Sequence, residues 1–244
     1  MESNKDEVLN SDKEDNAKKE TIYVYQKFIA ELIGTAFLVF VVTGISVFSF
    51  EKSYYSYNGG FEAAFVLTSM IYVFGRISGA HFNPAVSIPM FLRSKITLIE
   101  CCYYILAQIL GAFIGSIFVG LCNKGGFKVL SGNVISGDES WDYFSCFFIE
   151  VILTFGLVFV IFASTVKENN FGNLTGLIVG ISLYFLGITG SHVSGGSLNP
   201  ARSIAPAIIM AFTGDSEPIK DLWLYIVAPI IGGIFAGYLS LLFE

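Results

Sequence analysis

The sequence predicts an all-α membrane protein with six transmembrane helices and two re-entrant half-helices, arranged as two inverted repeats. Three observations support this fold class. The 244 residues are 54% hydrophobic and only 14% charged, whereas a soluble domain carries about 25% charged residues. The charges lie mostly between long apolar runs, and the second half of the chain repeats motifs of the first. A soluble protein with a large core is therefore disfavoured.

Six apolar runs approach the length of about 20 residues at which a helix spans the hydrocarbon of a bilayer. They are roughly Tyr25–Phe48, Phe61–Ile77, Leu98–Leu121, Tyr143–Val166, Leu174–Ile188 and Leu222–Phe243. Two further apolar runs, Asn83–Leu92 and Asn199–Thr213, are too short to cross, and their length is typical of re-entrant or buried helices. Eight basic residues lie on the side that holds the N-terminus and four lie on the opposite side. Because basic residues are enriched in cytoplasmic loops, we expect both termini in the cytoplasm.

The first 22 residues differ in composition from the rest of the chain. They contain seven acidic residues and four lysines with almost nothing apolar. Such a segment cannot bury enough surface to offset the entropy of ordering it. We therefore expect residues 1–22 to form a disordered, acidic, cytoplasmic tail and residues 23–244 to form the membrane domain.

Three matched motifs indicate that the membrane domain is duplicated. Glu31-Leu-Ile-Gly-Thr35 in the first run matches Glu150-Val-Ile-Leu-Thr154 in the fourth, at an offset of 119 (150 − 31). The third and sixth runs share a Tyr-Ile-x-Ala motif, starting at Tyr104 and Tyr225, at an offset of 121 (225 − 104). An Asn-Pro-Ala triplet recurs at an offset of 116 (199 − 83). We expect one repeat over about 23–121 and another over about 143–244. Because each contains three spans, the second must be inverted in the membrane.

The two triplets, Asn83-Pro84-Ala85 and Asn199-Pro200-Ala201, each begin a short apolar run. Asn is a good N-cap and Pro suits the first helical turn, so one such triplet would indicate only a helix start. Here both follow a Gly-containing approach, Ser78–Phe82 and Ser194–Leu198. Non-helical backbone is tolerated at membrane depth only where protein buries it or it lines a watery cavity. We therefore expect the carbonyl groups of both approaches to line a pore.

The segments Gly79–Ser87 and Gly195–Ser203 resemble the two signature segments of the aquaporin, or major intrinsic protein, family. The resemblance extends over about residues 24 to 243. It implies an aquaporin-type pore for passive flow of water that excludes protons and ions, in a homotetramer with one pore per subunit. It also implies that Asn83 and Asn199 donate hydrogen bonds to passing water where two half-helix N-termini meet. Arg202 is then the positively charged residue of the selectivity filter.

Glu31 and Glu150 are the acids deep in long spans, and they admit two interpretations. A coupled secondary transporter of a small solute would need such groups. The resemblance implies instead that they anchor the approach loops by accepting backbone hydrogen bonds, and their equivalent places in the repeats favour this role. His81, in the first signature segment, is expected to pack there. A third alternative is a junctional or regulatory membrane protein whose pore is nearly closed.

The family's offsets from the triplets place the remaining filter positions at Ala63 (83 − 20), Gly187 (199 − 12) and Gly196 (199 − 3). Water-selective members have an aromatic residue and a His at the first two positions. Their replacement by Ala and Gly implies a wider opening that also admits small uncharged solutes such as glycerol or urea. This inference depends on the second span, because Phe61 or Phe65 would narrow the opening if that helix were rotated.

Nothing in the sequence indicates an enzyme, because no nucleophile–base pair, metal-ligand set or phosphate-binding loop is recognisable. We expect no catalytic residue, no metal and no cofactor. The net charge of −6 gives no reason to expect nucleic-acid binding. The expected partners are water, small neutral solutes and the lipid of the plasma membrane or of an intracellular vesicle membrane.

Overall fold

The computed structural model describes residues 23–48, 52–135, 142–165 and 172–243, and the predicted acidic tail at 1–22 lies outside these ranges. The long helices are α2 (Val24–Phe48), α3 (Lys52–Ser78), α5 (Leu98–Cys122), α6 (Tyr143–Thr165), α7 (Thr175–Ser191) and α9 (Glu217–Leu239). The half-helices are α4 (Pro84–Leu92) and α8 (Pro200–Phe212), and short 3₁₀ turns are η1 (Gly126–Val129), η2 (Gly172–Leu174) and η3 (Ser240–Phe243). Within the described ranges, six helices, some extended by these turns, are long and apolar enough to cross a membrane, as predicted.

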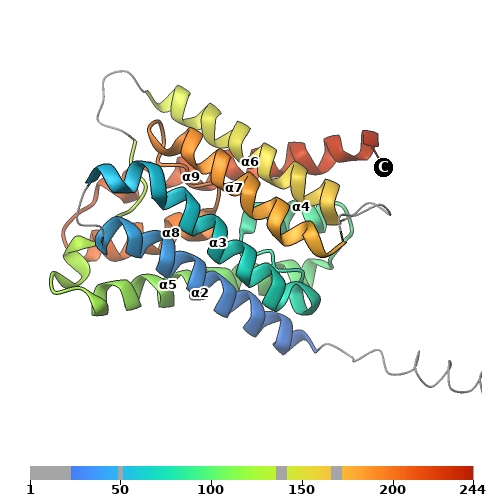
Figure 1. The fold of residues 1–244 in the computed structure, drawn as a ribbon, viewed down its shortest axis with the longest axis horizontal. Helices are drawn as coiled ribbons and strands as arrows, with labels where there is room; N and C mark the ends of the chain where they lie inside the picture. The colour runs from blue at the N-terminus through green and yellow to red at the C-terminus, as the bar shows by residue number, and fades with distance from the viewer. Residues whose placement is uncertain (1–22, 49–51, 136–141, 166–171, 244) are drawn as a thin grey trace, which may run out of the picture.

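The eight helices form one bundle with a pseudo-symmetric set of contacts. Helix α2 packs on α5 as α6 packs on α9, α3 packs on α7, and the half-helices α4 and α8 both pack on α9. The start of α2 and the end of the chain lie at the same end of the bundle, which we call the inner end (Figure 1). Helix α4 lies toward this end and α8 toward the opposite, outer end (Figure 1). The two half-helices therefore enter the bundle from opposite sides.

Glycines at corresponding positions allow the long helices of each half to approach closely. A Cβ added at Gly111 of α5 would collide with the carbonyl oxygen of Leu32 in α2. In the other half, a Cβ at Gly232 of α9 would collide with the carbonyl oxygen of Val151 in α6. Small residues of this kind allow membrane helices to pack backbone against backbone. The duplicated sequence motif therefore corresponds to a duplicated helix–helix contact.

The largest boundary difference between sequence and structure is at the start of α3. The apolar run predicts a span from Phe61, whereas the helix begins at Lys52. Hydropathy marks only the part of a helix that the hydrocarbon covers, which here is Gly60–Ser78. A helix that has already formed gains one hydrogen bond for each further residue, so it can extend past the apolar run through polar residues.

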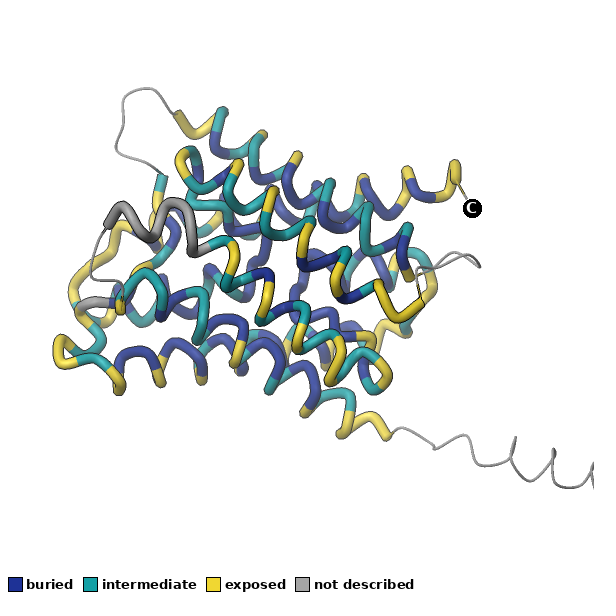
Figure 2. Tube along the Cα trace, viewed as in Figure 1, coloured by how far each residue is buried: buried dark blue, intermediate teal, exposed yellow. Residues whose placement is uncertain are grey.

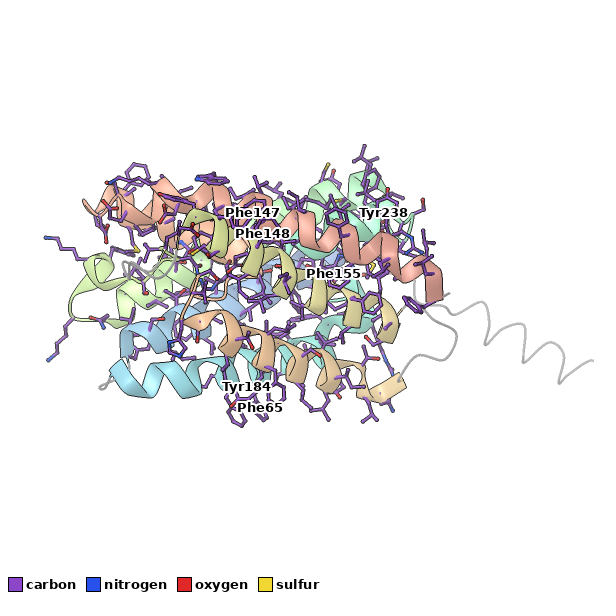
Figure 3. All side chains as sticks on the ribbon, turned by 90° about the horizontal axis from the view of Figure 1, so that it is seen from above. Phe65, Phe147, Phe148, Phe155, Tyr184 and Tyr238 are labelled. Carbon is purple, nitrogen blue, oxygen red and sulfur yellow. The ribbon has the colours of Figure 1, made fainter. Side chains whose placement is uncertain are left out.

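The outer surface of the bundle is apolar and aromatic. Buried residues lie along the inward faces of the helices, whereas exposed residues are spread over the outward faces (Figure 2). Large side chains such as Phe65, Phe148 and Tyr238 are exposed on this surface and project from it (Figure 3). Monomeric soluble proteins rarely expose so large an apolar surface. The surface fits an integral, multi-pass membrane protein, which the six apolar helices also indicate.

Candidate pore and selectivity filter

A cavity of about 1160 Å³ extends through the bundle. Near the inner end its walls include Lys27 and Lys95, and further along they include both Asn83 and Asn199. The remaining filter positions predicted from the sequence also line it: Ala63, Gly187, Gly196 and Arg202. The cavity therefore brings together residues that lie as much as 175 positions apart in the chain (202 − 27).

The rotation of α3 determines which side chains face the cavity. Ala63 lines it, together with Gly60 and Leu67. Phe61 and Phe65 are absent from the described cavity lining and are 52% and 55% exposed. Their rings pack against each other with centroids 4.4 Å apart, and Phe65 lies on the outer surface (Figure 3). In this structure neither phenylalanine narrows the opening beside Ala63.

The two triplet asparagines hold the two halves of the chain together. The side-chain oxygen of each caps its own half-helix: Asn83 accepts from the N–H of Ala85 at 2.8 Å, and Asn199 from that of Ala201 at 3.0 Å. The side-chain nitrogen of each donates to the opposite approach loop, Asn83 to the Leu198 carbonyl at 2.7 Å and Asn199 to the Phe82 carbonyl at 2.9 Å. An Asn amide has two N–H groups. One is used in this contact, which leaves the second for a molecule in the cavity.

The backbone of each approach loop takes the left-handed conformation at matching positions. Phe82 has a φ of 50° and Leu198 a φ of 54°. Bulky residues rarely adopt this region, which costs of order 1–3 kcal/mol each. Ala80 and Gly196 also match, with φ of 53° and 57°. Such conformations persist only where the surroundings hold them, and here buried carboxylates bind the loops.

Glu31 accepts four hydrogen bonds, all from groups of the inner half. Its donors are the Ser78 hydroxyl at 2.6 Å, the backbone N–H of His81 at 3.0 Å and of Phe82 at 2.7 Å, and the Gln108 side-chain nitrogen at 2.8 Å. Its side chain is 0% exposed. A buried carboxylate is tolerated when its oxygens are hydrogen-bonded in this way. The inner approach loop is thus bound to α2.

Glu150 makes the equivalent contacts in the outer half. It accepts from the Ser194 hydroxyl at 2.6 Å and from the backbone N–H groups of Ser197 at 2.8 Å and Leu198 at 2.9 Å. Like Glu31, it is fully buried and is absent from the described cavity lining. The geometry gives both carboxylates the same task, which is to bind the N–H groups of an approach loop.

In each half, one buried serine of the half-helix contacts the approach loop. In the inner half, His81 Nδ1 lies 3.0 Å from Ser87 Oγ, and the His81 ring also packs edge-on against Tyr104. In the outer half, Ser197 occupies the place of His81, and its Oγ lies 2.5 Å from Ser203 Oγ. His81 and Ser197 both line the cavity. The two halves therefore share a contact but present different groups to the pore.

The filter glycines differ sharply in the space around them. A Cβ added at Gly187 would meet nothing within 4 Å, so the absence of a side chain there leaves the cavity wide. A Cβ added at Gly196 would lie 2.8 Å from the carbonyl oxygen of Gly187. Arg202 lines the same region, and its side chain makes no hydrogen bond to any residue in the described ranges. Among the described residues nothing occupies its guanidinium donors, which lie beside the cavity.

Two sets of contacts were not foreseen from the sequence. The Tyr104 hydroxyl donates to the Ser78 carbonyl at 2.6 Å, and the Tyr225 hydroxyl to the Ser194 carbonyl at 2.7 Å. The repeat alignment already pairs these tyrosines, so their equivalence was a usable signal. Asn133, which binds Ser203, lies between the repeats and has no such signal.

Residues 18–240 match the major intrinsic protein family. The chain belongs to this family. It is 37% identical over 217 residues to the glycerol uptake facilitator protein-like 6 of Lactiplantibacillus plantarum, covering 87% of this chain and 95% of that protein. It is 35% identical to nodulin-26 of Glycine max, covering 87% and 76%.

Comparison with solved structures gives the same result for this member of the family. The X-ray structure of the aquaglyceroporin from Plasmodium falciparum superposes with a TM-score of 0.77 at 27% identity. The match covers 89% of this chain and 96% of that one. The predicted fold class, six spans and two half-helices in the aquaporin arrangement, is confirmed.

Proposed function

We propose that the protein is a passive channel for water and for small uncharged solutes such as glycerol and urea, and that it is not an enzyme. The observation that carries this proposal is the cavity that extends through the bundle. Its walls include both asparagines, Arg202 and the three small residues Ala63, Gly187 and Gly196. Membership of a channel family supports the same conclusion.

Exclusion of ions and protons follows from groups beside the cavity. The N-termini of α4 and α8 begin at the two asparagines, and each carries a partial positive charge. The free amide N–H of each asparagine would bind the oxygen of a permeating water, which leaves that water poorly placed to pass a proton along the file. Arg202 adds a full positive charge at the filter, and such a charge excludes protons and cations.

Passage of solutes larger than water is supported by the absence of bulk at the filter. With Ala at position 63 and open space beside Gly187, an uncharged polyol has room that an aromatic residue and a His would occupy. Arg202 offers donors to its hydroxyl oxygens. Two similar proteins, a glycerol uptake facilitator-like protein and an aquaglyceroporin, support glycerol as one such solute.

The two alternative functions receive less support. A transporter that uses Glu31 or Glu150 would need those groups to contact the solute or a proton path. Each instead accepts several hydrogen bonds from its own half, and neither is among the described residues that line the cavity. A nearly closed junctional protein is disfavoured by a cavity of about 1160 Å³.

The proposal includes the assembly and the orientation. We place the inner end, which carries both ends of the described chain, in the cytoplasm, on the basis of the basic residues of the loops. The membrane is the plasma membrane or that of an intracellular vesicle. The homotetramer rests on the family resemblance alone, because Gly111, Gly115 and Gly232 pack against helices of the same chain and are not free to form a subunit contact.

Stopped-flow light scattering of proteoliposomes tests the solute range. Shrinkage driven by sucrose measures water flow, and swelling after glycerol or urea uptake measures solute flow. The purified protein should raise all three rates above those of protein-free vesicles. Water flow without glycerol or urea flow would refute the wide filter, and flux that depends on an ion gradient would refute the passive channel.

A filter variant sharpens that test. Ala63→Phe combined with Gly187→His should lower glycerol flux at least tenfold while water flux falls less than threefold, because bulk is added where the structure has open space. Leu67→Ile, at another cavity-lining position, is the matched control for a change in the pore wall outside the proposed filter.

A further inference from the structure

The segment between the repeats crosses the outer approach loop. After η1, Leu130 is buried against Val119 and Met210, and η1 itself packs on α8. Further along, the backbone N–H of Ile135 donates to the Asp221 carboxylate at 3.0 Å. The linker from 130 to 135 is thus fixed at both ends to the bundle, although neither repeat includes it.

Asn133 is the point where this linker reaches the pore wall. Its side chain is buried, with 4% of its surface exposed, and its Oδ1 accepts from the Ser203 hydroxyl at 2.8 Å. Ser203 Oγ also lies 2.5 Å from Ser197 Oγ. Ser203 has only one hydroxyl proton and donates it to Asn133, so in the second contact Ser203 accepts from Ser197, whose own proton is shared between Ser203 Oγ and the Asn199 carbonyl oxygen at 3.1 Å. The cavity-lining Ser197 is therefore connected through Ser203 to Asn133.

In the inner half, the serine that matches Ser203 has a polar side-chain partner within the same repeat. There Ser87 Oγ accepts from the Gln108 side chain at 2.9 Å, and Gln108 also donates to Glu31. The position that matches Gln108 in the second repeat is Pro229 (108 + 121), which has no side-chain donor or acceptor. The second repeat therefore lacks a polar counterpart of Gln108 beside Ser203, and the linker supplies the Asn133 side chain there.

Asn133 also lies against the backbone of the filter. A Cβ added at Gly195 would come within 3.0 Å of Asn133 Nδ2, so the amide packs directly on Gly195. Gly195 and Gly196 line the cavity, and Arg202 immediately precedes Ser203. A shift of Ser203 or of Gly195 would move groups on both sides of the filter.

We propose that Asn133 is a positioning residue that sets the width and selectivity of the outer filter through its hydrogen bond with Ser203 and its contact with Gly195. The role in selectivity rests on the proposed function of the pore. The role in holding the loop does not rest on that function, because it concerns only how firmly residues 194–198 are held in place. Two readouts, one of transport and one of loop dynamics, separate the two statements.

The experiment uses the full chain in proteoliposomes. Asn133→Leu removes the acceptor at similar size, and Asn133→Asp keeps an acceptor for the Ser203 hydroxyl. Asn123→Ala is the control between the two repeats, because the Asn123 side chain accepts from the N–H of Gly125 in an exposed turn. Glycerol and water flow are measured at one temperature, and hydrogen–deuterium exchange is followed in parallel for the outer loop (194–198) and the inner loop (78–82).

We expect Asn133→Leu to change the ratio of glycerol to water flow at least threefold and to speed exchange in the outer loop at least tenfold, with no change in the inner loop. Asn133→Asp and Asn123→Ala should keep the ratio within twofold of the unmodified protein. Ser203→Ala should change both readouts in the same direction as Asn133→Leu, and the double variant should change them by less than the sum of the two, because both changes remove the hydrogen bond between Ser203 and Asn133.

An unchanged ratio and unchanged outer-loop exchange in Asn133→Leu would overturn the proposal. Equal acceleration of exchange in both loops would also overturn it, since that pattern indicates general destabilisation. If Asn133→Leu does not fold, failure of Ser203→Ala to change either readout overturns it instead. If the unmodified protein carries neither water nor glycerol, the proposed function fails, whereas faster exchange confined to the outer loop would still support the role of Asn133 in holding that loop.

Discussion

The inner and outer approach loops follow the same backbone path but present different groups to the pore. Both have left-handed residues at matching positions, both donate backbone N–H groups to a buried Glu, and both accept an amide hydrogen bond from the opposite Asn. The cavity wall differs, with His81 in the inner half and Ser197 in the outer half, and Arg202 occupies the place that Val86 has in the inner half. The duplication thus keeps the backbone scaffold and varies the side chains that line the cavity.

The largest effect should follow from removing either loop anchor. In Glu31→Gln one carboxylate oxygen becomes an NH₂ group, which faces donors instead of accepting from them. Each buried donor left unpaired costs about 1–3 kcal/mol, so we expect a loss of about 3 kcal/mol or more. Glu150→Gln should cost somewhat less, because Glu31 accepts four hydrogen bonds and Glu150 three.

Thermal denaturation in detergent, followed by size-exclusion chromatography, measures this difference. Glu100→Gln is a suitable control, because Glu100 forms a partly exposed ion pair with Lys27. If Glu150→Gln lowered the thermal stability more than Glu31→Gln, the number of hydrogen bonds would not explain the difference between the two anchors.

The second-largest loss of stability should follow from a change at Gly196, which matches Ala80 of the inner loop. Gly196→Ala would put a Cβ 2.8 Å from the Gly187 carbonyl oxygen at a φ of 57°. A left-handed conformation costs a residue with a side chain about 1–2 kcal/mol, and the contact adds to this, so we expect a loss of about 2 kcal/mol. Gly187→Ala, with nothing within 4 Å, should be neutral in the same thermal assay. Equal losses in the two variants would contradict the difference in space around these glycines.

Replacing Arg202 by the residue at the matching inner position tests the electrostatic difference between the two loops. Arg202→Val gives the outer loop the residue that the inner loop has at Val86. We expect proton or cation leakage across proteoliposomes to rise at least tenfold while water flow stays within about twofold, because the change removes the charge that we propose as the barrier at the filter. A pH-sensitive dye inside the vesicles and a potassium gradient report the leak. Arg202→Lys keeps the charge, so its leakage should stay as low as that of the unmodified protein. Equally low leakage in Arg202→Val would show that the half-helix dipoles alone suffice to exclude protons and cations.

The sequence was sufficient for those features that are repeated or locally encoded. The half-helices begin directly after their N-caps Asn83 and Asn199, as predicted, because an Asn cap followed by Pro specifies a helix start through nearby atoms alone. The same applies to the six spans, which follow from hydropathy. The start of α3 at Lys52 was missed, since hydropathy marks the hydrocarbon and not the helix.

Asn133 could not be predicted, for a different physical reason. Its partner Ser203 lies 70 residues away, and the two side chains meet only because α8 and the linker pack at the outer end. A contact of this kind leaves no period in the sequence, and the linker has no second copy to mark it. The predicted roles of Ala63, Gly187 and Gly196 likewise stay predictions until solute flow is measured, although all three line the cavity.

The smallest effect should come from two acidic residues at matching positions near the starts of α5 and α9, Glu100 and Asp221 (221 − 100 = 121). Glu100 binds Lys27 at 2.6 Å and completes the capping box with Thr97, where water can replace either contact. Glu100→Gln should therefore lower stability by at most about 1 kcal/mol. Asp221 is 8% exposed and accepts from the Ile135 backbone and the Tyr143 hydroxyl, which water cannot easily replace.

Asp221→Asn should therefore cost more, about 1–2 kcal/mol, since the new NH₂ group can face one of these donors. Because Ile135 is two residues after Asn133, the loss should also speed hydrogen exchange in residues 130–135, whereas Glu100→Gln should leave that segment unchanged. Equal and small effects in both variants would mean that the linker does not depend on Asp221. The linker would then be held by its other contacts, such as those of Asn133 and of the buried side chain of Leu130.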